Sequence, residues 1–486
     1  MDRTARTTVG SPAEIEAGTP DLLRHAAELA IAYRSSIPGR RVGPARGVSA
    51  DDLRAMVGRP LPEAGEEPRA VIDGLVAAVE PGLVTLSSPR YFGFVIGGSV
   101  PAALAADWLT STWDQNANLY LASPVAAVVE EVVGGWLIDL LGLPAGCSVG
   151  FTTGTTMAHF TGLAAARHSV LRAVGWDVEE DGLTGAPPIQ VIVGEDVHSS
   201  LVKALRLVGF GRGRAIRIPT DEEGRMRPAE LHRVLAELAA GPTIVCAQAG
   251  EVNTGAFDPL DKVADAVATR PGAWLHVDGA FGLWAAAAPG LRSRLDGHDR
   301  ADSWTTDAHK WLNVPYDSGL VFVRDAAAHR AAMGISAAYL PSAEGAERDP
   351  IDYVPEMSRR ARAFGVYAAL RSLGRAGVAE MVERDCAVAR RMADGLAAVP
   401  GADVLNEVVL NQVLVRFDDD DALTRDVVAR VQDEGTAWLG GTVFHGRAAM
   451  RISVSNWATT EADGDRSVAA IARCLADARR ARDGSG

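Results

Sequence analysis

The stretch Asp302-Ser-Trp-Thr-Thr-Asp-Ala-His-Lys-Trp-Leu-Asn313 decides how the rest of the chain is interpreted. An acidic and hydroxyl-rich run leads into His309-Lys310, and aromatic and apolar residues follow directly. A lysine in apolar surroundings loses hydration, which favours the neutral amine that can condense with an aldehyde. Nearly all of the 48 Lys and Arg residues are Arg, so a lysine between a histidine and a tryptophan is unusual. We therefore predict covalent chemistry at Lys310; the alternative is an ordinary surface lysine.

A second informative stretch, Trp274-Leu-His-Val-Asp-Gly-Ala-Phe281, predicts a short buried strand that ends in the carboxylate of Asp278. In open α/β sheets, ligands bind at the carboxyl ends of strands. A lysine for an aldehyde and an aspartate for a protonated ring nitrogen are the pair that pyridoxal 5'-phosphate (PLP) requires. His276 and Asp278 could instead be a metal pair, but no third ligand follows at a telling spacing, so we expect no metal.

Two motifs, His276-Val-Asp-Gly-Ala280 and Asp307-Ala-His-Lys-Trp-Leu312, resemble those of the PLP-dependent group II amino-acid decarboxylases. That family includes the aromatic L-amino acid, histidine and glutamate decarboxylases. The resemblance extends from about Tyr91 to the C-terminal region, and more weakly through the N-terminal segment. It implies an α/β protein of PLP fold type I, with a mostly parallel seven-stranded sheet in its large domain.

The resemblance also implies the domain organisation. We expect a helical N-terminal arm at 1–88, a large PLP-binding domain at 89–375 and a small α+β domain at 376–486. The arm contains many Pro, Gly and Arg residues and too little apolar surface to stand alone. In the resembled family this segment packs across a partner subunit, which implies a homodimer with active sites at the subunit interface. The alternative is a monomer whose arm folds on itself.

Composition excludes several other classes of protein. With 486 residues, two or three domains are expected. The formal net charge of −14 disfavours a nucleic-acid surface, and no apolar run reaches the roughly 18 residues of a membrane span. The N-terminus lacks the apolar core of a secretory signal. The four cysteines are scattered without a C-x-x-C pair, which is typical of free thiols in a reducing cytoplasm.

The middle of the chain alternates between short apolar runs and helical patterns. The predicted strands are 189–193, 243–248, 273–277, 303–306 and 319–323. Helical patterns lie between several of them, at 199–208, 228–240 and 258–269. This alternation predicts a mostly parallel sheet that is covered by helices on both faces. Further helices are predicted at 21–34, 49–57, 101–112, 125–141, 157–173, 376–398 and 421–434.

A phosphate site is predicted where a strand joins the helix at 157–173. Small and hydroxyl residues at a helix N-terminus offer free N–H groups and a favourable dipole, so Thr155 and Thr156 are our phosphate candidates. The family pattern is Gly-Gly-Thr-x-Ala-Asn or a close variant, whereas this chain has Gly154-Thr-Thr-Met-Ala-His159. We expect His159, which replaces Asn or Thr, to be a packing variation rather than a ligand.

The resemblance implies further cofactor contacts. His198, in a His-Ser-Ser motif, would stack over the PLP ring. Thr254 lies in a loop that passes near the cofactor in this family. Thr305 or His309 would contact the phosphate or the ring oxygen, and Asp307 stands where the family has Asn or Asp.

Two residues have two interpretations each. Tyr339 matches a loop tyrosine that in the resembled decarboxylases reaches a neighbouring active site and returns a proton to the substrate carbon. It could equally be a hydrophobic anchor at the base of the loop. Arg451 could bind a substrate carboxylate bidentately, or it could form an interdomain salt bridge.

The predicted function is PLP-dependent decarboxylation of an L-amino acid, with an aromatic substrate expected, to the corresponding amine. One alternative is an oxygen-using aldehyde synthase on the same scaffold, against which His198 and Tyr339 both argue. Others are an aminotransferase, a carbon–sulfur lyase, or a degenerate PLP fold that only binds partners. The order of the motifs favours the decarboxylases, and the intact Lys310 and Asp278 argue against a degenerate fold.

Overall fold

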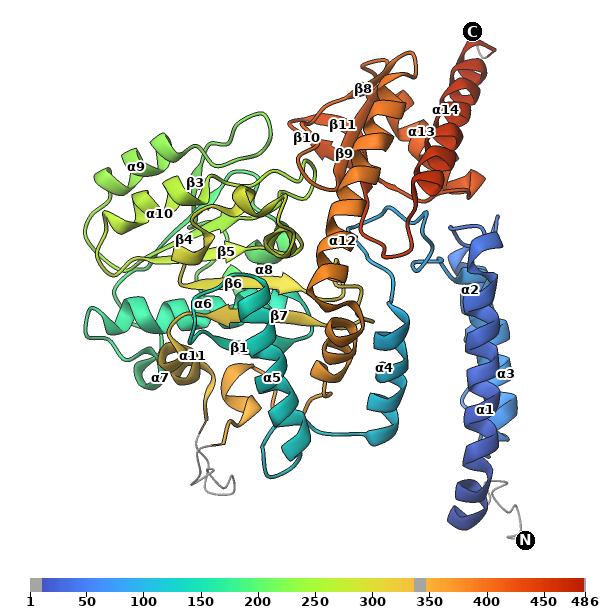
Figure 1. Ribbon diagram of the computed structural model, residues 1–486, viewed down its shortest axis with the longest axis horizontal. Helices are drawn as coiled ribbons and strands as arrows, with labels where there is room; N and C mark the ends of the chain where they lie inside the picture. Colours follow the sequence, from blue (N-terminus) through green and yellow to red (C-terminus); the bar gives the residue numbers. More distant parts are fainter. Residues whose placement is uncertain (1–10, 336–346, 485–486) are drawn as a thin grey trace.

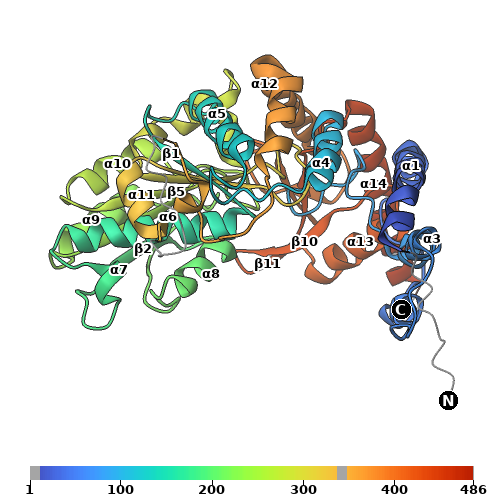
Figure 2. The same ribbon diagram turned by 90° about the horizontal axis from the view of Figure 1, so that it is seen from below.

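The computed structural model describes residues 11–335 and 347–484. Its N-terminal segment contains α1 (Pro12–Ser36), α2 (Ala50–Val57) and α3 (Pro68–Val79). Helix α1 begins well before the predicted residue 21, because Ser11 and Glu14 form a capping box at its start. Helices α1 and α3 lie side by side, apart from both sheets, at the right-hand edge of Figures 1 and 2.

The large body is built on a seven-stranded sheet with strand order β1-β7-β6-β5-β4-β2-β3. Its strands are β1 (Ser148–Thr152), β2 (Gln190–Gly194), β3 (Ile216–Ile218), β4 (Thr243–Gln248), β5 (Trp274–Asp278), β6 (Ser303–Asp307) and β7 (Gly319–Val323). Within this sheet, β7 is the one described strand that runs against the common direction of the others. The predicted mostly parallel seven-stranded sheet is therefore confirmed.

Helices cover both faces of this sheet (Figure 2), because its buried strands are apolar on both sides. One layer contains α6 (Thr155–Arg172), α8 (Ser199–Leu207) and α11 (Ala326–Met333), with the short α7 (Val178–Asp181) beside α6. The opposite layer contains α5 (Pro124–Leu140), α9 (Pro228–Glu237) and α10 (Leu260–Ala268). In β4, Ile244 and Cys246 pack toward the first layer, and Val245 and Ala247 toward the second.

Helix α4 (Pro101–Trp113) and α12 (Ala363–Ala397) pack against each other at the side of the large body. The 35-residue α12 then continues into the second, smaller sheet (Figure 1). Gly374 interrupts its helical geometry with φ 63° and ψ 178°, a conformation that glycine adopts readily. The domain boundary that we propose at residues 375/376 lies next to this kink, within α12.

The small sheet is antiparallel, with strand order β10-β11-β9-β8. Its strands are β8 (Ala402–Val404), β9 (Gln412–Phe417), β10 (Gly440–Phe444) and β11 (Arg447–Ser453). The end of α12 covers it together with α13 (Asp421–Glu434) and α14 (Glu461–Asp483), which enclose a second apolar core. The remaining elements are 3-10 helices: Ile37–Gly39, Glu80–Gly82, Gly282–Ala287, Arg292–Leu295, His298–Arg300 and Pro350–Tyr353.

All four cysteines are buried free thiols. Among the helices of residues 11–335 and 347–484, none combines the length and the apolar character that a membrane crossing requires.

Candidate active site

The candidate site lies where β5 and β6 end, side by side and parallel, with Asp278 opposite Thr305. Side chains alternate between the two faces of a strand, so every second residue points the same way. On these two strands the face toward α6 carries a polar stripe: Trp274, His276, Asp278, Ser303, Thr305 and Asp307. Polar groups on a buried face need partners, and α6 supplies several of them.

Lys310 follows β6 in a short turn and lies against the carboxylate of Asp307. Its Nζ is 3.2 Å from Asp307 Oδ2, and 18% of its side chain is exposed. Burial acts to raise the pKa of Asp307, but attraction to Lys310 and His309 outweighs burial and lowers it. We expected apolar surroundings for Lys310, but its amine has the carboxylate of Asp307 as a counter-ion. Trp311 does provide an apolar wall, and its Nε1–H donates to Asp385 at 2.8 Å.

Asp278 is a buried carboxylate with partners on both oxygens. Oδ1 accepts the N–H of Ala280 at 3.1 Å, and Oδ2 lies 3.2 Å from His159 Nε2. Burial acts to raise the pKa of Asp278, but His159, and then the charges of His198 and Lys310, lower it far below its usual value. Asp278, His198 and Lys310 thus act on one another electrostatically, as their predicted shared role requires.

His198 caps the N-terminus of α8. Its Nδ1 is 2.7 Å from Ser200 Oγ, and its backbone N–H donates to Gln248, the neighbour of Asp278 in the sheet register. Burial lowers the pKa of His198, while the charge of Asp278 acts to raise it. The imidazole is half-buried and close enough to Asp278 for each to act on the charge of the other.

The start of α6 lies beside the Lys310 turn. The N–H of Thr155 donates to Asp307 Oδ1 at 2.7 Å. Thr155 Oγ1 and Ser318 Oγ are both buried and have no hydrogen-bond partner among the described residues. Gly154 and Gly319 touch backbone to backbone, and a Cβ on Gly319 would collide with Gly154. Two free hydroxyls beside a helix N-terminus are suited to a phosphate group.

The two predicted phosphate or ring-oxygen ligands point in different directions. His309 Nδ1 accepts the N–H of Ser318 at 3.1 Å, and its ring lies 4.4 Å from that of Tyr316. His309 therefore belongs to the end of the site where Thr155 and Ser318 lie. Thr305 Oγ1 is fully buried and lies 3.4 Å from His159 Nδ1, which places it at the Asp278 end.

His159 was expected to be a packing variation rather than a ligand, and its surroundings show more than packing. It is fully buried and contacts both Asp278 and His276. The signal was present in the sequence: Thr155, His159 and Gly162 follow the helical spacing i, i+4, i+7. Ser318 was missed altogether, because only the pairing of β7 with β1 brings it next to the start of α6.

Thr254 is not brought into this cluster. Its hydroxyl donates to the carbonyl of Glu223 at 2.7 Å, and its N–H donates to Glu251.

Arg451 has no ion pair or side-chain hydrogen bond within the described part of the chain, so the interdomain salt bridge is not seen there. Burial lowers the pKa of Arg451, and the opposing charge that acts on it is Glu251. Tyr339 lies outside the described residues.

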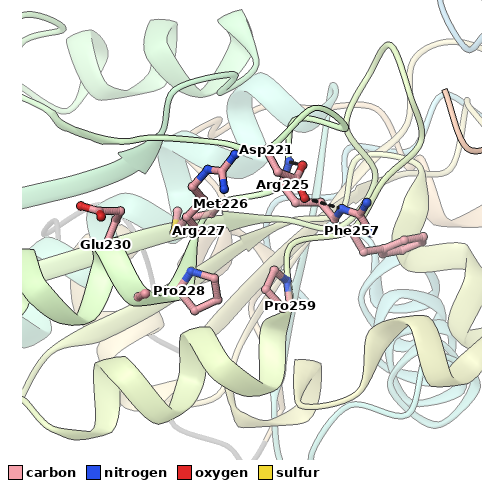
Figure 3. A pocket seen from close by; sticks show the side chains of 9 residues that line it. Asp221, Arg225, Met226, Arg227, Pro228, Glu230, Phe257 and Pro259 are labelled. Carbon is pink, nitrogen blue, oxygen red and sulfur yellow. Dashed lines mark hydrogen bonds and ion pairs between the residues drawn. The ribbon is translucent and has the colours of Figure 1, made fainter. Parts of the chain in front are cut away.

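A cavity of about 590 Å³ lies elsewhere on the large body (Figure 3). It is lined by Asp221, Arg225, Met226, Arg227, Pro228, Ala229, Glu230, Phe257 and Pro259. None of these is a predicted site residue, and Arg225 is already paired with Asp221. Within residues 11–335 and 347–484, no group of three or more His, Cys, Asp or Glu side chains is arranged to hold a metal ion.

The chain is similar to known proteins along most of its length. The family model for the pyridoxal-dependent decarboxylase conserved domain matches residues 51–418. Tryptophan decarboxylase 1 of Oryza sativa subsp. japonica is 32% identical over 415 residues, 79% of each chain. L-2,4-diaminobutyrate decarboxylase of Rhizobium meliloti (strain 1021) is 30% identical over 432 residues, 84% of this chain and 83% of that one. A crystal structure of Oryza sativa TDC with PLP and tryptamine is similar with a TM-score of 0.87 and 26% identity, covering 97% of this chain and 99% of that one.

Proposed function

Since this chain belongs to the pyridoxal-dependent decarboxylase family and is a carboxy-lyase that uses PLP, we propose that it converts an aromatic L-amino acid into the amine and carbon dioxide. The observation that carries the proposal is the grouping of Lys310, Asp278 and His198, which lie at or follow the carboxyl ends of β6, β5 and β2. Each of the three has a distinct task in such a reaction.

The described residues fit PLP. Lys310 has the only amine in the cluster and would hold the aldehyde carbon. Asp278 is kept ionised and would hold the ring nitrogen in its protonated form, while the imidazole of His198 would lie against the ring. When bound, PLP supplies an electron sink for the bond broken at the substrate Cα.

The phosphate group would occupy the other end of the site. Thr155 and Thr156 open α6, and the free hydroxyls of Thr155 and Ser318 would donate to phosphate oxygens. His309, held by the Ser318 N–H, would border the same group. Filling the site would thus give hydrogen bonds to two buried groups that lack them otherwise.

Proton handling falls to Lys310 and Tyr339. The carboxylate of Asp307 holds Lys310 Nζ in place, and an amine in that position can transfer a proton to or from a neighbouring group. By resemblance, Tyr339 returns a proton to the substrate carbon, and this role rests on the sequence match alone.

An aromatic substrate is favoured by the side chains near Lys310. Gly97 packs against the Lys310 carbonyl, so the segment that contains Phe94 passes beside the lysine. Phe94 is 59% exposed and lies 5.5 Å from the ring of Trp438. Tyr316 is also exposed and borders His309. Flat apolar rings of this kind favour a flat apolar substrate side chain. The names of the relatives alone do not decide, since one names tryptophan and another 2,4-diaminobutyrate.

The substrate carboxylate would be bound by Arg451. The guanidinium of Arg451 is half-buried on β11 and has no ion pair among the described residues. Removing such a charge from water costs free energy, and a bound anion would offset that cost. The charge of Glu251 acts on Arg451, but the two side chains form no salt bridge. The guanidinium of Arg451 can therefore bind a substrate carboxylate.

We further propose a cytoplasmic homodimer. Helices α1 and α3 expose a set of apolar side chains: Ile15, Leu23, Ile31, Val71, Leu75 and Val76. Helices α4 and α5 expose another: Trp108, Leu109, Trp113, Val125, Val128 and Val132. A second copy of the chain would cover both sets, as the predicted arm exchange requires. Four buried free thiols are consistent with a reducing compartment. Sedimentation equilibrium checks this: a mass near 51 kDa, that of one chain, would contradict the dimer.

The activity is tested with purified enzyme, PLP and a panel of aromatic, acidic and diamino L-amino acids. Carbon dioxide and amine in equal amounts from an aromatic member are expected. Ammonia with hydrogen peroxide would instead indicate an aldehyde synthase, and turnover only of acidic or diamino acids would contradict the aromatic assignment. Tyr339→Phe should keep carbon dioxide release but divert product toward aldehyde and peroxide, and an unchanged amine yield would remove Tyr339 from the mechanism.

A further inference from the structure

A chain of hydrogen-bonding side chains runs beneath Asp278. Trp274 Nε1–H donates to Ser303 Oγ at 2.8 Å, and Ser303 Oγ is 2.7 Å from His276 Nδ1. His276 Nε2 is 2.9 Å from His159 Nδ1, and His159 Nε2 is 3.2 Å from Asp278 Oδ2. His159 Nε2 makes no hydrogen bond of ideal geometry among the described residues, and its polar neighbour there is Asp278 Oδ2.

The two ends of the chain fix the direction of its protons. The indole N–H of Trp274 can only donate, and an ionised Asp278 can only accept. With both imidazoles neutral, the Ser303 O–H donates to His276 Nδ1, and His276 Nε2–H donates to His159 Nδ1. His159 Nε2–H then points at Asp278. Every contact has one donor and one acceptor, so a single arrangement of protons satisfies all five residues.

Burial isolates this chain from solvent. His159, His276 and Ser303 are wholly inaccessible to solvent, and Trp274 is buried behind them. Burial is the main cause that lowers the pKa of His276 to about 3, so His276 stays unprotonated in the physiological range. The indole N–H at the far end is too weakly acidic to release its proton. The chain therefore does not conduct protons to water, and its effect on Asp278 is electrostatic.

Other groups also face this carboxylate. His198 approaches from α8, Lys310 from the turn after β6, and the thiol of Cys246 from β4. The hydroxyl of Thr305 lies beside His159. Of these groups, His198 and Lys310 belong to the expected contacts of PLP itself. The backbone N–H of Ala280 and the side chain of His159 remain on Asp278 whatever binds on the other side, and His159 is the side-chain partner of the two.

We propose that His159 is a positioning residue, which holds Asp278 ionised from beneath and thereby fixes a proton on the ring nitrogen of PLP. The inference rests on the proposed role of Asp278 as the partner of that nitrogen. A donor on one oxygen stabilises the carboxylate, and an ionised carboxylate in turn favours the protonated ring. Without His159, burial raises the proton affinity of Asp278 and the charge pair is weakened.

The first test compares binding of PLP with binding of its 1-deaza analogue, which has C–H in place of the ring nitrogen. His159→Leu removes the donor, whereas His159→Gln retains a donor and an acceptor at similar positions. We expect His159→Leu to weaken PLP about tenfold at neutral pH, and His159→Gln less than threefold. Affinity for the analogue should change less than twofold in both. An equal loss for both ligands, or no loss for either, would overturn the proposal.

Two controls separate this result from other failures. His329 is an equally buried histidine, bonded to Ser148 and to the Tyr353 carbonyl, so His329→Leu should leave the PLP-to-analogue ratio unchanged. A changed ratio in that variant would count against a specific effect of His159. Asp278→Ala tests the premise: if it binds PLP and the analogue in the same ratio as the unaltered enzyme, the role of Asp278 fails, and the inference with it.

A second measurement reads the proton positions directly. Two-bond proton–nitrogen NMR spectra of the cofactor-free protein, labelled with ¹⁵N-histidine, report the tautomer of each imidazole, and His159→Gln and His276→Gln serve only to assign the signals. His276 should be a neutral Nε2–H tautomer from pH 6 to pH 8, and His159 should carry its hydrogen on Nε2. A hydrogen on Nδ1 with none on Nε2 at His159, or protonation of His276 in this range, would contradict the proton arrangement.

Discussion

Lys310 Nζ lies 3.2 Å from Oδ2 of Asp307, three residues before it in the chain. The same carboxylate accepts the N–H of Thr155 through its other oxygen. One side chain thus joins the amine to the first turn of α6, which fixes the spacing between the two ends of the site. The arrangement gives Lys310 a defined position before any ligand arrives.

Borohydride reduction of the enzyme with PLP should attach the cofactor to Lys310 alone. Lys203 and Lys262 are the other two lysines and serve as internal controls in the peptide map. Lys310→Ala should lose the label, the visible absorption of the lysine-linked cofactor and turnover by at least 10³-fold. Label on Lys203 or Lys262 in the unaltered enzyme would refute the assignment.

Thr155→Val should leave the cofactor-free protein as stable as before, because its buried hydroxyl has no partner to lose. PLP affinity should fall about tenfold, since one donor to the phosphate is removed. Thermal unfolding without PLP and a binding titration measure the two effects. Thr161→Val is the matched control, because its hydroxyl donates to Met157 within α6. An unchanged PLP affinity in Thr155→Val would place the phosphate elsewhere.

Arg451→Met should raise the KM for the substrate at least tenfold, because the carboxylate loses a bidentate partner. The kcat should change less, since the fork holds the substrate and does not transfer protons. Steady-state kinetics separate the two constants. Arg447, on the same strand but exposed and paired with Asp419, gives the control variant Arg447→Met. A KM within twofold of the unaltered enzyme would restore the interpretation of Arg451 as structural.

Asp385 should make stability depend on pH. Burial raises its pKa to about 8, with the Trp311 hydrogen bond acting in the opposite direction. The folded chain therefore holds a proton that the unfolded chain releases near pH 4. Stability is full below that pH and falls as the pH rises toward 8, by at most about 1.4 kcal/mol per pH unit.

Asp385→Asn should abolish this fall while its amide oxygen still accepts from Trp311. Urea unfolding between pH 5 and pH 8 gives the free energies to compare. Asp394→Asn, at an exposed position of α12, is the control. If Asp385→Asn and the unaltered chain lose stability in parallel as the pH rises, the neutral form of Asp385 is excluded.

The parts of the site that the sequence predicted are those carried by contiguous motifs. Lys310 and Asp278 each end a recognisable strand, and strand ends meet at one edge of a parallel sheet whatever the details of packing. The helix start at Thr155 was likewise visible from local composition. The alternation of strands and helices predicted the large sheet, although not that β7 would run antiparallel.

What escaped prediction depends on register between distant elements. His159 contacts Asp278 because α6 lies across β5 and β6. The inward residues of α6 recur about every fourth position, whereas those of a strand recur at every second position. The sequence does not show how these two patterns align. Thr254 lies in a matching motif, but a motif does not say where a hydroxyl points, and this one bonds to Glu223. The early start of α1 was readable from Ser11-x-x-Glu14 and was overlooked.

Gly374 is the residue of α12 whose backbone angles depart from the helix. Beyond it, the Asp385 carboxylate accepts a hydrogen bond from Trp311, the immediate neighbour of Lys310. The later part of the same helix packs against the small sheet. One helix segment thus contacts both the small sheet and the residue next to the proposed PLP-binding lysine, so we expect a displacement of that sheet to change the position of Lys310.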